Sequence, residues 1–247
     1  MVENSFTPAK MFLKMPPRLI PNELTLNNYI EAFKLPYLPR WILNTSIIMV
    51  VAVILGIVIN GAAGYVFAFA KYKWCVYIFW TLMSSIFVTR YVLLISQFMI
   101  VGALGLRGLP AVILVLLFWP TGIYLFRNYY KAIPVELIES ARIDGAKEWR
   151  ILTSIVLPLS KPILGAAIVF LGMGVLGDYI WQMLNLQDPV EKTYLVGLMS
   201  STLDVYKVKN IGYDLAVGTL LFIPYLIIFS VSSRYFIEGL TTGGLKE

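Results

Sequence analysis

The 247-residue sequence contains no histidine and a single cysteine, Cys75. These absences exclude a Ser/His/Asp triad, a Cys/His nucleophile, a zinc site built from histidines or several cysteines, and an internal disulfide. There is also no G-x-x-x-x-G-K-[ST] loop and no G-x-G-x-x-G fingerprint, so we expect no nucleotide binding by this chain alone. Paired catalytic carboxylates are missing from its apolar stretches. We therefore expect no catalytic residues, no metal ion and no cofactor.

Charged residues are scarce as well, at 14% against about a quarter in typical soluble domains, while hydrophobic residues make up 59%. Several stretches are apolar over the roughly 20 residues that cross about 30 Å of hydrocarbon. The composition therefore predicts an all-α, polytopic integral membrane protein that contacts the lipid bilayer. We expect about five spans, at Trp41–Ala70, Trp74 to about Leu94, Gly108–Phe126 with a kink at Pro120, from after Pro162 to about Leu184, and Leu215–Ser233.

Five spans would place the two ends of the chain on opposite sides of the membrane. The basic residues of the loops do not choose the orientation, because the two sides carry ten and nine. The densest group, six basic residues from Arg127 to Lys161, indicates that loop 127–161 is cytoplasmic. We therefore expect a multi-pass protein of the cell membrane, with residues 1–40 outside, 41–236 forming the membrane domain, and the tail 237–247 in the cytoplasm.

Loop 127–161 has the most regular pattern in the sequence. Pro134 suits the first turn of a helix, and Asp144-Gly145 is typical of a helix C-cap or turn. After Gly145, apolar residues recur on one helical face until Leu157-Pro158 ends the run. The pattern predicts two short amphipathic helices, joined at Gly145 and lying along the cytoplasmic face.

Three segments of this loop together resemble the cytoplasmic coupling motif of permease subunits of ATP-binding cassette importers. They are Glu139-Ser140-Ala141, Asp144-Gly145-Ala146 and Ile155-Val156-Leu157-Pro158. Outside the loop, Gly177-Asp178-Tyr179-x-Trp181 and the closing segment from Arg234 to Thr241 are similar to the maltose-type carbohydrate permeases. Ser140 stands where that family usually has alanine, a change between two small residues.

The resemblance implies the type I importer transmembrane fold and import of a sugar or related carbohydrate by alternating access. It also implies the partners: a homologous second permease subunit, two ATP-binding subunits that hydrolyse ATP, and an extracytoplasmic sugar-binding protein, with no nucleic acid. Such permeases usually have six spans, so the resemblance implies a further span upstream of residue 1. The residues implied to couple to the ATPase are Glu139, Ser140, Ala141, Asp144, Gly145, Ala146, Ile155, Leu157 and Pro158.

Polar residues inside the expected spans leave several interpretations open. Asp178 can form a hydrogen bond within the bundle, line a translocation cavity, or reach the outer boundary of the membrane. Tyr179 and Trp181 can stack on a sugar ring, although a tryptophan near the end of a span is more often an interfacial anchor. Asn60 lies among Gly56, Gly61 and Gly64, which favours a helix-packing seam over a ligand site.

A secondary transporter or a channel-like subunit is the alternative to an ATP-driven importer. In such a transporter, Arg90 and Asp178 would form a charge relay. Secondary transporters commonly contain internal repeats with broken helices, and no repeat is visible in this sequence. The patterned loop 127–161 would also be unexplained, so the importer is preferred.

Overall fold

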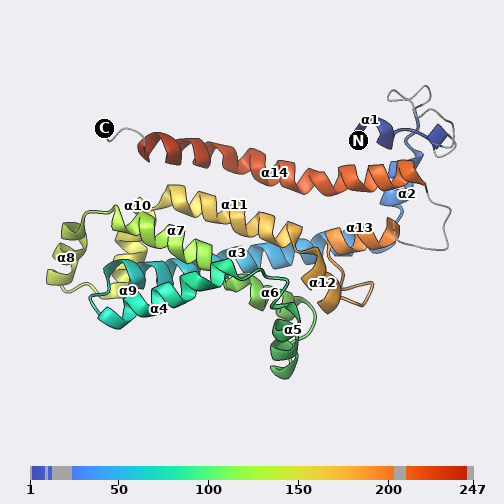
Figure 1. The fold of residues 1–247 in the computed structure, drawn as a ribbon. Helices are drawn as coiled ribbons and strands as arrows, with labels where there is room; N and C mark the ends of the chain where they lie inside the picture. Colours follow the sequence, from blue (N-terminus) through green and yellow to red (C-terminus); the bar gives the residue numbers. More distant parts are fainter. Residues whose placement is uncertain (1, 9–10, 13–23, 203–209, 244–247) are drawn as a thin grey trace.

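The computed structural model describes residues 2–8, 11–12, 24–202 and 210–243, with side chains as far as Ser230. The regular structure in these residues is entirely helical, with η2 a 3-10 turn and η3 a π-helical turn (Figure 1). In chain order the elements are α1 (Val2–Ser5), α2 (Asn27–Phe33), α3 (Leu38–Phe69), α4 (Lys73–Ser84), η2 (Ser85–Phe87), α5 (Leu94–Ala103), α6 (Leu109–Leu117), α7 (Pro120–Lys131), α8 (Val135–Ile143), α9 (Glu148–Ile151), η3 (Leu152–Val156), α10 (Leu157–Leu159), α11 (Lys161–Gly177), α12 (Tyr179–Asn185), α13 (Tyr194–Thr202) and α14 (Ile211–Gly243).

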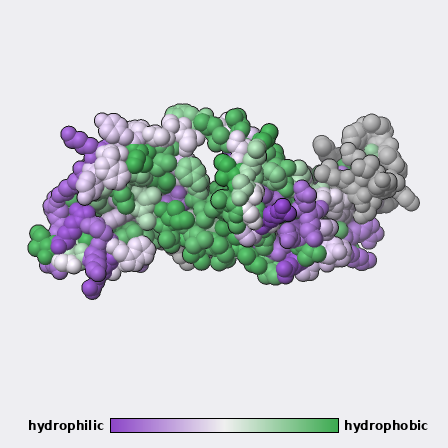
Figure 2. All heavy atoms as spheres, turned by 90° about the horizontal axis from the view of Figure 1, so that it is seen from below, coloured by the Kyte–Doolittle hydropathy of each residue, from purple (hydrophilic) through white to green (hydrophobic). Residues whose placement is uncertain are grey.

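The long helices α3 and α14 run along the length of an elongated bundle, with α7 and α11 beside them (Figure 1). Both are long and apolar enough to cross a membrane, and two bent helix pairs bring the number of possible spans in the described residues to four. Apolar residues gather around the middle of the molecule and hydrophilic residues at its two ends (Figure 2). The prediction of an all-helical membrane bundle is confirmed.

The second expected span, Trp74 to about Leu94, is not one helix, so its predicted bounds are wrong. α4 ends at Ser84, and α5, which begins at Leu94, points away from the bundle (Figure 1). The hydroxyls of Ser84 and Ser85 donate to carbonyl oxygens of the preceding turn, at 2.7 and 2.6 Å. Such local bonds compete with the helical ladder and favour its end. An apolar composition alone carries no sign of this break.

The third expected span bends at Pro120, as predicted. α6 and α7 meet at 42°, and the buried side chain of Asn60 bridges the break. Its amide nitrogen donates to the carbonyl of Leu117 at 3.0 Å, and its oxygen accepts from the backbone N–H of Trp119 at 3.3 Å. Asn60 therefore satisfies backbone groups that the break leaves without helical partners.

The expected packing seam around Asn60 is confirmed. A Cβ atom added to Gly64 would lie 2.6 Å from the Cβ of Phe126, so α3 and α7 approach one another too closely for a larger residue. Glycine at such positions lets two helix backbones come together. The seam holds α7, and hence the start of the loop that follows it, against α3.

The fourth expected span is also interrupted, so the prediction of a continuous helix to Leu184 is wrong. α11 ends at Gly177, Asp178 has φ −84° and ψ 65°, and α12 starts in a new direction at Tyr179 (Figure 1). The side chain of Gln182 donates to the carbonyl of Val175. Gln182 thus supplies a partner for a carbonyl near the end of α11.

The last helix extends beyond the expected span. α14 continues to Gly243, whereas the sequence predicted that the span would end at Ser233. Residues 244–247 of the expected tail, and residues 1, 9–10 and 13–23 of the expected N-terminal segment, lie outside the described part of the chain. The C-terminal end of α14 is at the same end of the bundle as α8, whereas α1 and α2 are at the opposite end (Figure 1).

Candidate coupling site

The motif loop begins with α8, which ends in a Schellman motif. Gly145 has φ +79°, and its N–H donates to the carbonyl of Arg142 at 3.0 Å. The N–H of Ala146 donates to the carbonyl of Ala141, also at 3.0 Å, and both alanines pack against one apolar cluster. This pair of bonds, with its apolar contact, requires a left-handed residue at the glycine position. The predicted junction of two helices at Gly145 is therefore confirmed, and Asp144 is the C-cap residue.

The second half of the loop is one helical run from Glu148 to Leu159, which then turns by 87° into α11. The sequence predicted that Leu157-Pro158 would end the run, but the helix passes through Pro158 and ends at Ser160, whose hydroxyl donates to the carbonyl of Val156 at 2.6 Å. The π-helical turn η3 ends at Val156, two residues before Pro158, which has no N–H to donate to the ladder. Ile155 and Leu157 are half-buried against the bundle, whereas Pro158 is exposed.

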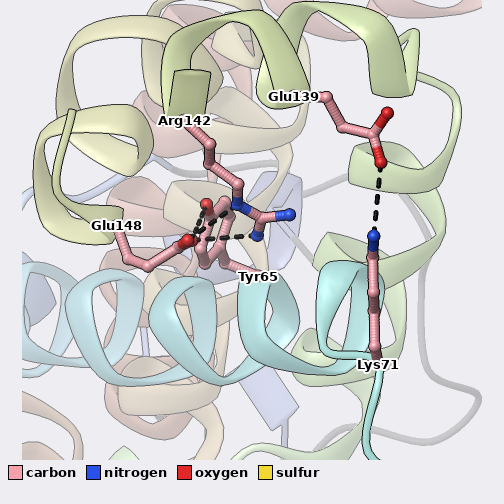
Figure 3. A network of polar contacts seen from close by, with 5 residues as sticks. All are labelled: Tyr65, Lys71, Glu139, Arg142 and Glu148. Carbon is pink, nitrogen blue, oxygen red and sulfur yellow. Dashed lines mark hydrogen bonds and ion pairs between the residues drawn. The ribbon is translucent and has the colours of Figure 1, made fainter. Parts of the chain in front are cut away.

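A polar network connects this loop to α3 (Figure 3). Arg142 near the end of α8 donates twice to Glu148 at the start of α9, from Nε to Oε1 at 2.7 Å and from Nη2 to Oε2 at 3.1 Å. The hydroxyl of Tyr65 on α3 donates to the same carboxylate. Lys71, just after α3, forms a longer contact of 3.4 Å with Glu139. The carboxylate of Glu148 thus joins three helices at one point.

Arg142 and Glu148 stabilise one another's charged forms. Hydrogen bonds from Arg142 lower the pKa of Glu148, and the hydrogen bond to Glu148 raises the pKa of Arg142. The side chains of Arg142 and Glu148 are 30% and 56% exposed. An ion pair this open to water contributes at most about 1 kcal/mol of stability. Its main effect is therefore on the relative placement of α8, α9 and α3.

The surface of the loop carries large apolar side chains that nothing in the described chain covers. Ile143 is 86% exposed, Trp149 62% and Leu137 47%, whereas Ile138 on the opposite side of α8 is fully buried. α8 lies at the far end of the molecule, beyond the bundle (Figure 1). Large apolar side chains exposed beside charged ones are typical of a protein interaction site. Glu139, Ser140 and Asp144 are exposed on the same loop.

The other predicted site, around Asp178, lies toward the opposite end of α11. Asp178 forms an ion pair with Arg90 at 3.0 Å, and their side chains are 11% and 42% exposed. Of the three open interpretations of Asp178, this contact favours a bond within the bundle. Tyr179 is half-buried. Its predicted role in the translocation path stays a prediction.

Trp181 is buried within the bundle. It is 1% exposed, and its indole N–H donates to the carbonyl of Ala111 at 3.3 Å. Its predicted role in the translocation path stays a prediction. The break at Asp178 turns α12 so that Trp181 packs against α6, and a sequence pattern cannot show this turn.

A cavity of about 720 Å³ opens between η2, the segment after it, α5, α6, α7 and α11. Arg90, Gln97 and Thr121 bring polar groups to its wall, and Trp119 and Phe170 bring aromatic rings whose centroids are 6.0 Å apart. Sequence reasoning named Arg90 only as a possible relay and did not name the others. Their residue types are common in membrane helices, and only the broken helices bring them together.

Residues 52–241 match the family described as "Binding-protein-dependent transport system inner membrane component". The chain is 31% identical to the arabinooligosaccharides transport system permease protein AraQ of Halalkalibacterium halodurans, over 98% of this chain and 88% of that protein. It is also 31% identical to the galactooligosaccharides transport system permease protein GanQ of Bacillus subtilis, over 98% and 87% of the two chains.

Among solved structures, the chain resembles one chain of a bacterial ABC transporter involved in the import of the acidic polysaccharide alginate. The TM-score is 0.78 at 20% identity, over 95% of this chain and 88% of that chain. The fold is thus that of importer transmembrane subunits, and the relatives are transport permeases and not enzymes. The chain is a multi-pass membrane protein and belongs to the family of binding-protein-dependent transport system inner membrane components.

Proposed function

We propose that this chain is the membrane-spanning permease subunit of an ATP-driven importer, and that it moves a sugar or related carbohydrate across the cell membrane by alternating access. The observation that carries the proposal is the projecting α8 loop, which presents Ile143, Trp149 and charged residues to a partner. The printed names of two relatives, which refer to oligosaccharide transport, support the substrate class. The chain has no phosphate-binding loop, so the ATP is hydrolysed by another subunit.

In this proposal α8 lies in a groove on the ATPase subunit, as a short helix does in other helix-in-groove contacts. The exposed Ile143 fills the groove, and Glu139 and Asp144 make charged contacts at its edge. When two ATPase subunits close, the helices move as rigid bodies with the attached loops. Ala141 and Ala146, together with Ile155 and Leu157, pack the loop against the bundle and so pass this movement to the spans.

The arrangement of the ends supports an orientation. We place the α8 loop and the C-terminal end of α14 in the cytoplasm, because they share one end of the bundle (Figure 1). Residues 186–193 and the described part of the N-terminal segment are then extracytoplasmic. The homologous second permease would pack beside the bundle, and the sugar-binding protein would dock at the extracytoplasmic end.

The experiment that tests the proposal uses Gly145. A Cβ atom there would meet nothing within 4 Å, so a substitution acts only through the backbone conformation at φ +79°. A β-branched residue in this region costs about 1–3 kcal/mol, whereas asparagine tolerates it. Gly145→Val should insert into the membrane normally, retain little of the ATPase during co-purification, and lose uptake of labelled oligosaccharide. Gly145→Asn should retain most of both.

Ser140→Ala is the control. The Ser140 hydroxyl donates to the carbonyl of Glu136 in its own helix at 2.7 Å, so the change to the residue usual in the family should be nearly silent. If Gly145→Val co-purified the ATPase and imported sugar as the unmodified chain does, α8 would be only an interfacial connector. The proposal would then lose the observation that carries it.

A further inference from the structure

Helix α3 is tied to loops at both ends of the molecule. Its 32 residues extend about 48 Å, well beyond the roughly 30 Å of the hydrocarbon. At the end away from α8, the Trp41 indole donates to the carbonyl of Pro189 at 2.7 Å. The buried Asn44 side chain donates to the carbonyls of Val190 and Lys192 at 2.9 and 3.0 Å. α3 therefore holds the segment between α12 and α13 directly.

At the other end of α3, the connection to the α8 loop passes through one carboxylate. Tyr65 is on α3, Arg142 is in the last turn of α8, and Glu148 is in the first turn of α9 (Figure 3). Glu148 accepts from both of the other side chains, and Arg142 and Tyr65 also interact with one another. Glu148 is the shared acceptor of the three. The nearby Lys71–Glu139 contact is a weaker tie, because it is 3.4 Å long and the side chains are 81% and 49% exposed.

Apolar contacts of the buried Ile138 and the partly buried Ala141 and Ala146 also seat the loop against the bundle. α8 is nine residues long and packs chiefly against α9, and the Gly145 turn between them is exposed and has open space around it. The apolar contacts of Ile138 and Ala141 are not directional, so they fix the position of α8 more than its orientation. A bidentate arginine–carboxylate pair fixes the relative orientation of the two groups that it joins. The geometry needed for a fixed angle is therefore present at Glu148 and at few other places in the described loop.

We propose that Glu148 is a positioning residue, which holds α8 at a fixed angle to α3 so that movement of α8 is passed along α3 to the segment 186–193. The inference rests on the proposed function, because α8 must contact an ATPase for the movement to arise. Its particular claim is that the sugar imported per ATP depends on Glu148, through Arg142 and Tyr65. Because the pair is partly exposed, its loss changes the placement of the loop more than it changes folding.

The first test needs no partner. Spin labels are placed at Ile143, which is 86% exposed, and at Val50 on α3, which is 56% exposed, after Cys75 has been replaced by serine. Val50 and Tyr65 are 15 residues apart, about 22 Å along the helix, so the labels fall in the range of pulsed electron-spin distance measurements. The distance distribution should be narrow in the otherwise unmodified chain. It should become clearly broader with Glu148→Ala and with Tyr65→Phe.

The matched control is Tyr72→Phe. Tyr72 follows α3 at the same end and is 66% exposed, and its ring stacks on Trp74. Like Tyr65→Phe, this change removes one tyrosine hydroxyl, but that hydroxyl does not bond to the Glu148 carboxylate. The distance distribution should therefore stay narrow. The exchange Arg142→Glu with Glu148→Arg restores an ion pair across the turn and should recover part of the narrow distribution. Equal widths for Glu148→Ala and Tyr72→Phe would overturn the inference.

The second test uses the assembled importer in proteoliposomes and measures sugar uptake and ATP hydrolysis in the same sample. With Glu148→Ala, the ATPase should still co-purify, and the sugar imported per ATP hydrolysed should fall by about tenfold. A residue with only a structural role would lower both rates together and leave the ratio unchanged, which would refute the positioning role. If the unmodified chain failed to bind an ATPase at all, the proposed function would fail, while the label distances would still decide whether Glu148 positions α8.

Discussion

The ion pair between Arg90 and Asp178 connects two breaks in the helices. Arg90 lies in the turn between η2 and α5, and Asp178 lies between α11 and α12. Removing one partner of a fully buried pair costs about 3–5 kcal/mol, and an exposed pair is worth about 1 kcal/mol or less. Since Asp178 is 11% and Arg90 42% exposed, we expect a coupling free energy between these limits, at about 1–2 kcal/mol.

The test is a double-mutant cycle with Asp178→Asn, Arg90→Gln and the double variant. Each single substitution leaves its partner without a counter-charge, so each should lower the free energy of unfolding by about 1–3 kcal/mol. The double variant removes both charges and should lose less than the sum of the two. Unfolding of the purified protein by titration with sodium dodecyl sulfate measures all four free energies.

An exposed arginine elsewhere in the chain provides the control for this cycle. Arg107 lies in the turn before α6, and Arg107→Gln combined with Asp178→Asn should be additive. A coupling free energy between Arg90 and Asp178 within about 0.5 kcal/mol of zero would refute the reasoning. It would show that the contact does not hold the two breaks together.

Two further predictions concern single groups. Asn60→Leu should lower the free energy of unfolding by about 2–4 kcal/mol, because it leaves the Leu117 carbonyl and the Trp119 N–H without their partner; an unchanged unfolding curve would contradict this role. Hydrogen bonds from Arg142 lower the pKa of Glu148, so the stabilisation by this pair is present above the ordinary glutamate pKa and is lost as the pH falls through the lowered value. The distance distribution between labels at Ile143 and Val50 should therefore be constant from about pH 8 to about pH 5 and broaden only below about pH 4; broadening near pH 6 would assign the effect to another group.

The features that the sequence predicted well are local in the chain. Asp144, Gly145 and Ala146 are consecutive, and the Schellman motif they form is closed by Ala141 and Arg142, which are only a few residues earlier. Pro120 likewise bends its span through a local effect, because its ring removes the backbone N–H that would continue the helical hydrogen bonds. For such features, the residues that determine the structure are also neighbours in the sequence.

The features that the sequence missed depend on contacts between distant segments. Tyr65 and Glu148 are 83 residues apart, and the sequence did not pair them. Arg90 and Asp178 are 88 residues apart, and the sequence paired them only as a charge relay in the alternative transporter. Trp181 is a tryptophan near the end of an expected span, which is typical of an interfacial anchor. It is buried because α12 turns at Asp178. One sequence cannot show which polar groups meet across the bundle, so it cannot show where an apolar stretch is broken.

Two of the breaks, between η2 and α5 and between α6 and α7, line one cavity, and this location bears on transport. Irregular backbone at membrane depth is tolerated where it is buried in protein or lines a cavity, because elsewhere its polar groups would face lipid. The cavity of about 720 Å³ is lined by Ser85, Thr89 and Arg90 from one break, and by Phe118 and Trp119 from another. Arg90, Gln97 and Thr121 bring hydrogen-bonding side chains to its wall. We infer that this cavity belongs to the translocation path, because the polar groups exposed by the breaks are the kind that a hydrated sugar can exchange for water.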